Sequence, residues 1–81
     1  MSLNDFPMIA GSQGHSARIL SLSGPQDVVD RLREMGFCEG VSVEVIRRLP
    51  FGGPCIVQMG ASAFALRQEE AMCAHVEWLA A

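Results

Sequence analysis

Five side chains in this sequence have the chemistry to bind a metal ion or to act as a nucleophile or base. They are Cys38, Cys55, Cys73, His15 and His75. Only Cys73 and His75 stand at a spacing that favours chelation, because residues two apart on a strand share a face. Three widely spaced cysteines form neither a disulfide framework nor a Cys-x-x-Cys knuckle. We therefore expect no metal site or cofactor, and Cys38, Cys73 and His75 are the weak candidates should a divalent ion bind.

The three thiols differ in their sequence surroundings. Cys55 and Cys73 stand among apolar residues, which predicts small buried hydrophobic side chains. Cys38 lies between Phe37 and Glu39 in a turn flanked by glycines, where an exposed thiolate is more plausible. A chemical role, if any thiol has one, is therefore expected at Cys38.

The remaining residues do not provide the parts of an enzyme. The 81-residue chain contains no Tyr and no Lys, and His15 and His75 lie in no recognisable nucleophile motif. A Gly-x-x-x-x-Gly-Lys phosphate loop is absent, which excludes GTP hydrolysis by this chain. A substrate pocket of roughly 300 Å³ would also consume much of so small a core. We expect a protein without catalytic activity.

The charge balance argues against nonspecific binding to polyanions. Six arginines and nine acidic residues give a net charge of -3 and a pI near 5.1. A local patch at Arg47 and Arg48 keeps an RNA-binding small barrel as a third hypothesis, although no nucleic-acid partner is expected. No apolar run approaches the ~20 residues of a membrane helix, and no basic leader precedes an apolar segment. The sequence predicts a cytoplasmic protein that does not insert into the membrane.

The first half of the chain predicts an arm, a strand and a helix. Residues 1–13 are expected to form an arm or a loose first strand, and residues 17–22 a short strand. Ser23 and Gln26 make a candidate capping box for a helix with an apolar stripe at residues 28, 29, 32 and 35. Gly36 ends this helix, because a glycine allows the left-handed turn that folds Phe37 back onto the stripe.

In the second half of the sequence, apolar residues recur at every second position, which is typical of strands. Valines at residues 41, 43 and 45 alternate with polar residues, and strands are expected over 55–59, 63–66 and 75–79. A single helical turn is expected over 67–72. The predicted fold is mainly β: a small SH3-like barrel over residues 14–81, with one early α-helix and a short late helical turn.

Several segments together resemble the FeoA family over about residues 14–78. They are Arg-Leu-Arg-Glu-Met-Gly-Phe at 31–37, Gly40, Val-Glu-Val at 43–45, Arg47-Arg48, Pro54, and Ala-Leu-Arg-Gln-Glu-Glu-Ala at 65–71. The resemblance implies a small cytoplasmic SH3-like barrel that works, without catalysis, with the ferrous-iron transporter FeoB. FeoB is a membrane protein with a cytosolic GTPase domain. The chain departs from the pattern at Cys38-Glu39, where the family often has a proline, and at Gly53, where an aspartate commonly precedes the proline.

The predicted partner-binding surface combines the end of the helix with the tip of a hairpin. Its residues are Arg31, Leu32, Met35, Gly36, Phe37, Gly40 and Phe51. Met35 or Phe37 would be a rigid anchor on the glycine turn, with Arg31 as a charged rim. The alternative is that Leu32 and Met35 are core residues and that both glycines serve the backbone alone.

Two aromatic residues leave further alternatives open. Phe51 is either a plug folded back onto the barrel or an exposed contact. Trp78 either packs on the barrel or takes part in a homodimer, which exposed strand edges make plausible. Three functions are retained in order: an accessory protein that binds the cytosolic part of FeoB, a divalent-metal-binding iron sensor, and an RNA-binding barrel.

Overall fold

The valine alternation after Gly40 produces a strand with one buried face. In β2 (Ser42–Arg48), Val43 and Val45 are buried while Ser42 and Glu44 are exposed. The computed structural model describes residues 1–5, 15–49 and 51–79, and the same pattern recurs in its other strands. These are β1 (His15–Leu22), β3 (Cys55–Met59), β4 (Ser62–Leu66) and β5 (Ala74–Trp78). The mainly β prediction is confirmed.

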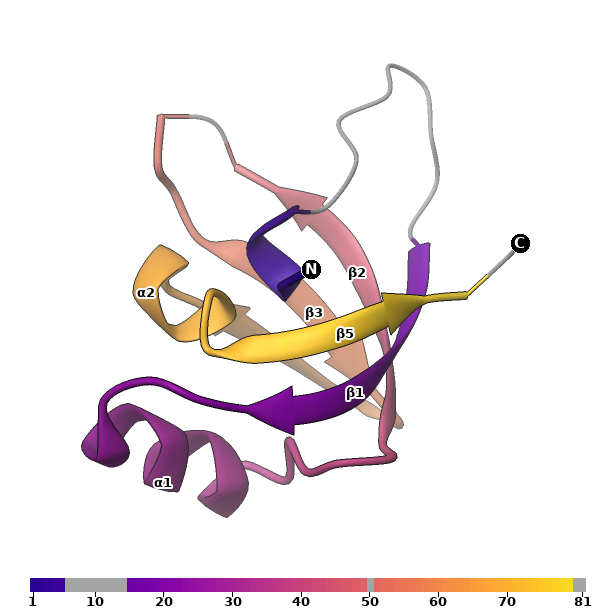
Figure 1. The fold of residues 1–81 in the computed structure, drawn as a ribbon. Helices are drawn as coiled ribbons and strands as arrows, with labels where there is room; N and C mark the ends of the chain where they lie inside the picture. The colour runs from indigo at the N-terminus through magenta and orange to yellow at the C-terminus, as the bar shows by residue number, and fades with distance from the viewer. Residues whose placement is uncertain (6–14, 50, 80–81) are drawn as a thin grey trace.

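The five strands form one antiparallel sheet in the order β4-β3-β2-β1-β5 (Figure 1). Its register shifts between Ile19 and Ser21 in β1 and between Val45 and Arg47 in β2. An extra residue in one strand bends it and increases its twist. These two bulges curve the sheet around a single core, in which Ile19, Val45 and Val57 are almost fully buried.

Three short helical segments accompany the sheet. They are η1 (Leu3–Asp5), α1 (Gln26–Glu34) and α2 (Gln68–Ala71). Figure 1 shows α1 outside the sheet beyond the end of β1, and η1 between α2 and β5. Within the described residues, no helix is both long and apolar enough to cross a membrane.

The start of α1 differs from the prediction. Pro25 is the N-cap, and no side chain caps the helix. The capping box of Ser23 and Gln26 is therefore wrong: Ser23 Oγ lies 2.6 Å from His75 Nε2 in a hydrogen bond, and Gln26 donates to Asp30. The last strand of the sheet, 52 residues later in the chain, offers Ser23 a partner that the local sequence cannot reveal.

The first residues of the chain pack on the barrel. Leu3 is fully buried, and Val76 N–H donates a hydrogen bond to the Met1 carbonyl at 2.7 Å. Ser2 also forms a bridge with His75 of β5. Of the arm predicted over 1–13, residues 1–5 therefore belong to the folded unit, and 6–13 lie outside the described residues.

A partly buried ion pair joins the two α-helices. Glu70 in α2 is 7% exposed, and its carboxylate accepts the Arg67 N–H at 2.8 Å and Arg31 Nη1 at 3.0 Å. The first bond completes the capping box of α2, and the second reaches across to α1. Arg31 thus positions its helix against the barrel.

We predict that Arg31→Met lowers the free energy of unfolding by about 1–2 kcal/mol, because the buried Glu70 carboxylate loses its charged partner. The control is Arg18→Met, which removes the exposed Arg18–Glu77 pair at 3.7 Å and should cost at most about 0.5 kcal/mol. Urea unfolding followed by circular dichroism measures both. Equal losses in the two variants would show that burial of Glu70 does not strengthen the pair.

Candidate partner-binding surfaces

The first predicted surface begins where α1 ends at a glycine turn. Gly36 adopts φ 101°, its N–H donates to the Arg33 carbonyl at 3.0 Å, and Phe37 N–H donates to the Leu32 carbonyl at 2.9 Å. These two bonds form a Schellman motif, which satisfies the free carbonyls at a helix end. The prediction that Gly36 ends the helix and turns Phe37 back is confirmed.

This same turn removes two of the predicted contact residues from the surface. Phe37 and Leu32 are both 0% exposed, and the Phe37 ring meets the Phe64 ring edge to face at 5.3 Å. Burial of such side chains stabilises the fold by about 1.5–3 kcal/mol each. The expectation that Phe37 is an exposed anchor is therefore wrong, whereas the core alternative for Leu32 is confirmed. Met35 is half-buried against the core.

Charged side chains around the turn pair with one another. Arg33 makes two hydrogen bonds to the Glu39 carboxylate, at 2.9 and 3.2 Å. These bonds hold the pKa of Glu39 below and that of Arg33 above their usual values. Arg31 is likewise engaged, by Glu70. The helix end presents paired charges instead of a free cationic rim, and no local sequence pattern indicated the Arg33–Glu39 pair.

Gly40 serves the connection between α1 and β2. It has φ 88°, and its N–H donates to the Ile19 carbonyl at 2.8 Å. Ile19 N–H in turn donates to the Val41 carbonyl at 2.9 Å. Gly40 therefore positions the loop on β1 through its backbone, in agreement with the simpler interpretation of this glycine.

The second predicted surface is the loop between β2 and β3. Phe51 is 104% exposed and adopts φ 60°, followed by Gly52 at φ 73°. The Leu49 N–H donates to the Pro54 carbonyl at 3.0 Å and closes the loop. Of the two alternatives for Phe51, the structure shows the exposed side chain and not the folded-back plug.

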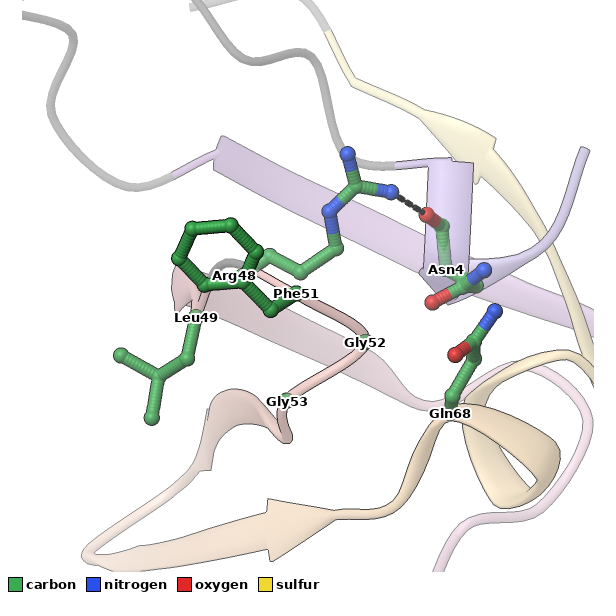
Figure 2. A pocket seen from close by; sticks show the side chains of 7 residues that line it. All are labelled: Asn4, Arg48, Leu49, Phe51, Gly52, Gly53 and Gln68. Atoms are coloured by element: carbon green, nitrogen blue, oxygen red, sulfur yellow. Dashed lines mark hydrogen bonds between the residues drawn. The ribbon is translucent and has the colours of Figure 1, made fainter.

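A hollow of about 230 Å³ lies beside this loop. Figure 2 shows its lining: Asn4, Arg48, Leu49, Phe51, Gly52, Gly53 and Gln68. Arg48 Nη1 donates to the Asn4 carbonyl, so this guanidinium holds the N-terminal segment against the loop. The cationic patch expected at Arg47 and Arg48 is thereby reduced to one exposed arginine, Arg47, and one half-buried arginine in an internal hydrogen bond.

The candidate metal ligands do not form one cluster. Cys38 follows the C-terminal end of α1, whereas Cys73 lies at its opposite end, against Gly24. Cys73 precedes β5 and donates its S–H to the Glu69 carbonyl at 3.2 Å, so its predicted place on a strand with His75 is wrong. Among the residues that the structure describes, no three His, Cys, Asp or Glu side chains gather at a potential metal site.

Burial makes two of the thiols poor metal ligands and nucleophiles. It raises the pKa of Cys55 to about 11 and also raises the pKa of Cys73. Both thiols remain protonated at neutral pH, and a thiolate is the reactive and metal-binding form. The buried positions predicted for Cys55 and Cys73 are confirmed, and Cys38 is half-buried.

Comparisons with known proteins identify the family to which this fold belongs. The FeoA domain family matches residues 1–77, and no curated protein matches the sequence. Stenotrophomonas maltophilia FeoA, solved with zinc and described as a procaryotic SH3 domain protein, is 33% identical with a TM-score of 0.76. That match covers 95% of this chain and 89% of the other.

Two further structures extend the likeness. Chlorobium tepidum FeoA is 28% identical with a TM-score of 0.80, and the match covers 99% of this chain and 71% of that one. A crystal structure of an iron uptake regulatory protein (FeoA) is 23% identical, with a TM-score of 0.81 over 98% and 97% of the two chains. This last likeness concerns the fold alone. The chain belongs to the FeoA family, whose members are small SH3-like, noncatalytic accessory proteins of iron(II) transport.

Proposed function

We propose that this protein acts in the cytoplasm by binding the cytosolic region of the transporter FeoB through the loop that carries Phe51. The observation that supports this function best is that the Phe51 ring is completely exposed. Phe51 is also a bulky residue with a positive φ, which such residues rarely adopt. Membership of the FeoA family supports a role in iron(II) transport but does not identify the binding surface.

The positive φ of Phe51 makes the loop conformation unfavourable in free energy. A left-handed backbone costs a non-glycine residue roughly 1–2 kcal/mol, and the exposed Phe51 ring does not offset this cost by packing against the described part of the chain. Aromatic side chains are enriched at the centres of protein interfaces, where a pocket in the partner buries them. A partner with an apolar pocket would bury Phe51 without rearranging the barrel.

The loop is also held in place from both sides. The bond from Leu49 N–H to the Pro54 carbonyl closes its base, and Arg48 fixes its flank to Asn4. A constrained loop loses less conformational entropy on binding than a flexible one. Exposed Arg47 stands next to this flank and would suit an acidic rim around the pocket.

Phe51→Asn tests this surface, because Asn tolerates a positive φ and replaces the apolar ring with a small polar amide. We expect the affinity for detergent-solubilised full-length FeoB to fall at least tenfold, which equals about 1.4 kcal/mol. Biolayer interferometry with the tagged full chain measures the affinity. The matched control is Leu20→Asn, which removes a large side chain that is 55% exposed on β1 and should leave the affinity unchanged.

Two results would contradict the proposal. Unchanged affinity of the Phe51→Asn variant would remove the loop as the docking surface, and absence of binding by the wild-type chain would remove FeoB as its direct partner. Met35→Glu probes the helix end instead, since Met35 is only partly buried. Phe37→Ser is unsuitable because Phe37 lies in the core and its loss would unfold the domain.

The thiols separate this function from that of a metal sensor. At pH 7.5 we expect iodoacetamide to label Cys38 and to spare Cys55 and Cys73, because burial raises the pKa of both inner thiols. Labelling of Cys55 should accelerate as the pH rises toward about 11. Mass spectrometry identifies the labelled residues. Stoichiometric Zn(II) binding that blocks Cys55 or Cys73 would favour the sensor.

A further inference from the structure

The two edges of the sheet differ in how they are protected. β5 forms one edge, where Val76 N–H donates to the Met1 carbonyl and Ser2 bridges to His75. β4 forms the other edge, and among the described residues no strand pairs with its outer side. An unpaired edge presents free N–H and C=O groups that can pair with another chain.

The turn before β4 determines which groups face outward. Met59 pairs with Ser62 across the two-residue turn Gly60-Ala61, in which Gly60 has φ 61°. A two-residue hairpin closes on a hydrogen-bonded pair, and such pairs alternate with non-hydrogen-bonded ones along the ladder. Ala63 and Ala65 fall on the non-hydrogen-bonded positions, so their N–H and C=O groups point away from β3.

This edge lacks the features that usually prevent pairing. Residues 62–66 read Ser-Ala-Phe-Ala-Leu and contain neither a charge nor a proline. The β3–β4 register runs without a bulge from Cys55↔Leu66 to Met59↔Ser62. Charged side chains, prolines and bulges are the common means by which proteins block their edges. Within the part of the chain that the structure describes, the β4 edge is therefore regular and unpaired.

We propose that β4 pairs antiparallel with β4 of a second copy of this chain, centred on Phe64. The segment Ala63-Phe64-Ala65 is palindromic, and with Phe64 on the two-fold axis Ala63 lies opposite Ala65 of the second copy and Ala65 opposite its Ala63. The outward groups of these residues then form four hydrogen bonds related by a two-fold axis. The small exposed alanine side chains allow the two edges to approach closely.

An extended segment of another protein is the rival occupant. A hollow of about 420 Å³ lies next to Ala65, lined by Gly52, Pro54, Ala65, Arg67, Gln68 and Glu69. A peptide could place one side chain there. The edge itself, however, offers alanine side chains, which cannot select a particular peptide sequence, whereas the two outward-facing alanines of a second copy match those of the first.

A five-residue edge buries less than a standard interface, so dimerisation is expected at concentrations on the order of 0.1–1 mM.

Paired charges test this register. In Ala63→Glu/Ala65→Glu each Glu faces a Glu of the second copy, whereas in Ala63→Glu/Ala65→Lys each Glu faces a Lys. We expect the double-Glu variant to remain monomeric and the Glu/Lys variant to dimerise at least tenfold more tightly than the double-Glu variant. Sedimentation equilibrium of the full chain from 10 µM to about 1 mM measures this. The control Ser21→Glu/Ser42→Glu adds the same charge on exposed inner-strand positions and should dimerise almost as the wild type does.

Amide hydrogen exchange provides a second measurement. The Ala63 and Ala65 amides should become protected as the concentration of the wild-type chain rises, and those of the double-Glu variant should not. A wild-type chain that stays monomeric at about 1 mM overturns the proposal and leaves the edge to a peptide. A dimer that the double-Glu variant retains also overturns it, because another surface would then join the copies. Neither result depends on whether the chain binds FeoB.

Discussion

The turn from α1 into the barrel depends on one constraint, the burial of the Phe37 ring. Gly36 reverses the chain within two residues, which no residue with a Cβ would do without strain. Phe37 then contacts Phe64 of β4, the edge strand that β3 and β2 separate from β1. The helix, the loop to β2 and the inner face of β4 are thus joined through one side chain. In an 81-residue domain with a small core, the loss of this contact would affect all three.

Much of the fold follows from local sequence patterns. Alternating valines predict β2, the glycine after an apolar stripe predicts the end of α1, and β3 has the predicted bounds of Cys55–Met59. These features depend on backbone geometry and on which face of an element is buried. Both can be predicted from the types and spacing of residues close together in the sequence. The failures involve partners distant in the chain. Ser23 bonds to His75, and Leu3 enters the core from a segment that reads as an arm.

The candidate site divides in the same way. The sequence identifies Phe51 and the helix end as notable but cannot decide which of their side chains are exposed. Phe37 is buried because tertiary packing provides Phe64, whereas Phe51 is exposed because its loop projects beyond the sheet. Three of the arginines also have partners that the local sequence does not indicate. Arg31, Arg33 and Arg48 each have an internal acceptor that lies at least six residues away. A count of positive charges therefore overstates the cations that a partner meets.

The projecting loop has a consequence for how members of this family diverge. The Phe51 ring contributes no packing to the barrel, so folding restricts this position through its positive φ and not through the packing of its side chain. Substitutions there could retune recognition while the scaffold remains intact. Positions such as Phe37 and Glu70, in contrast, can change only together with their neighbours. Under the function proposed here, variation at the loop tip between species should track variation in the surface of the transporter.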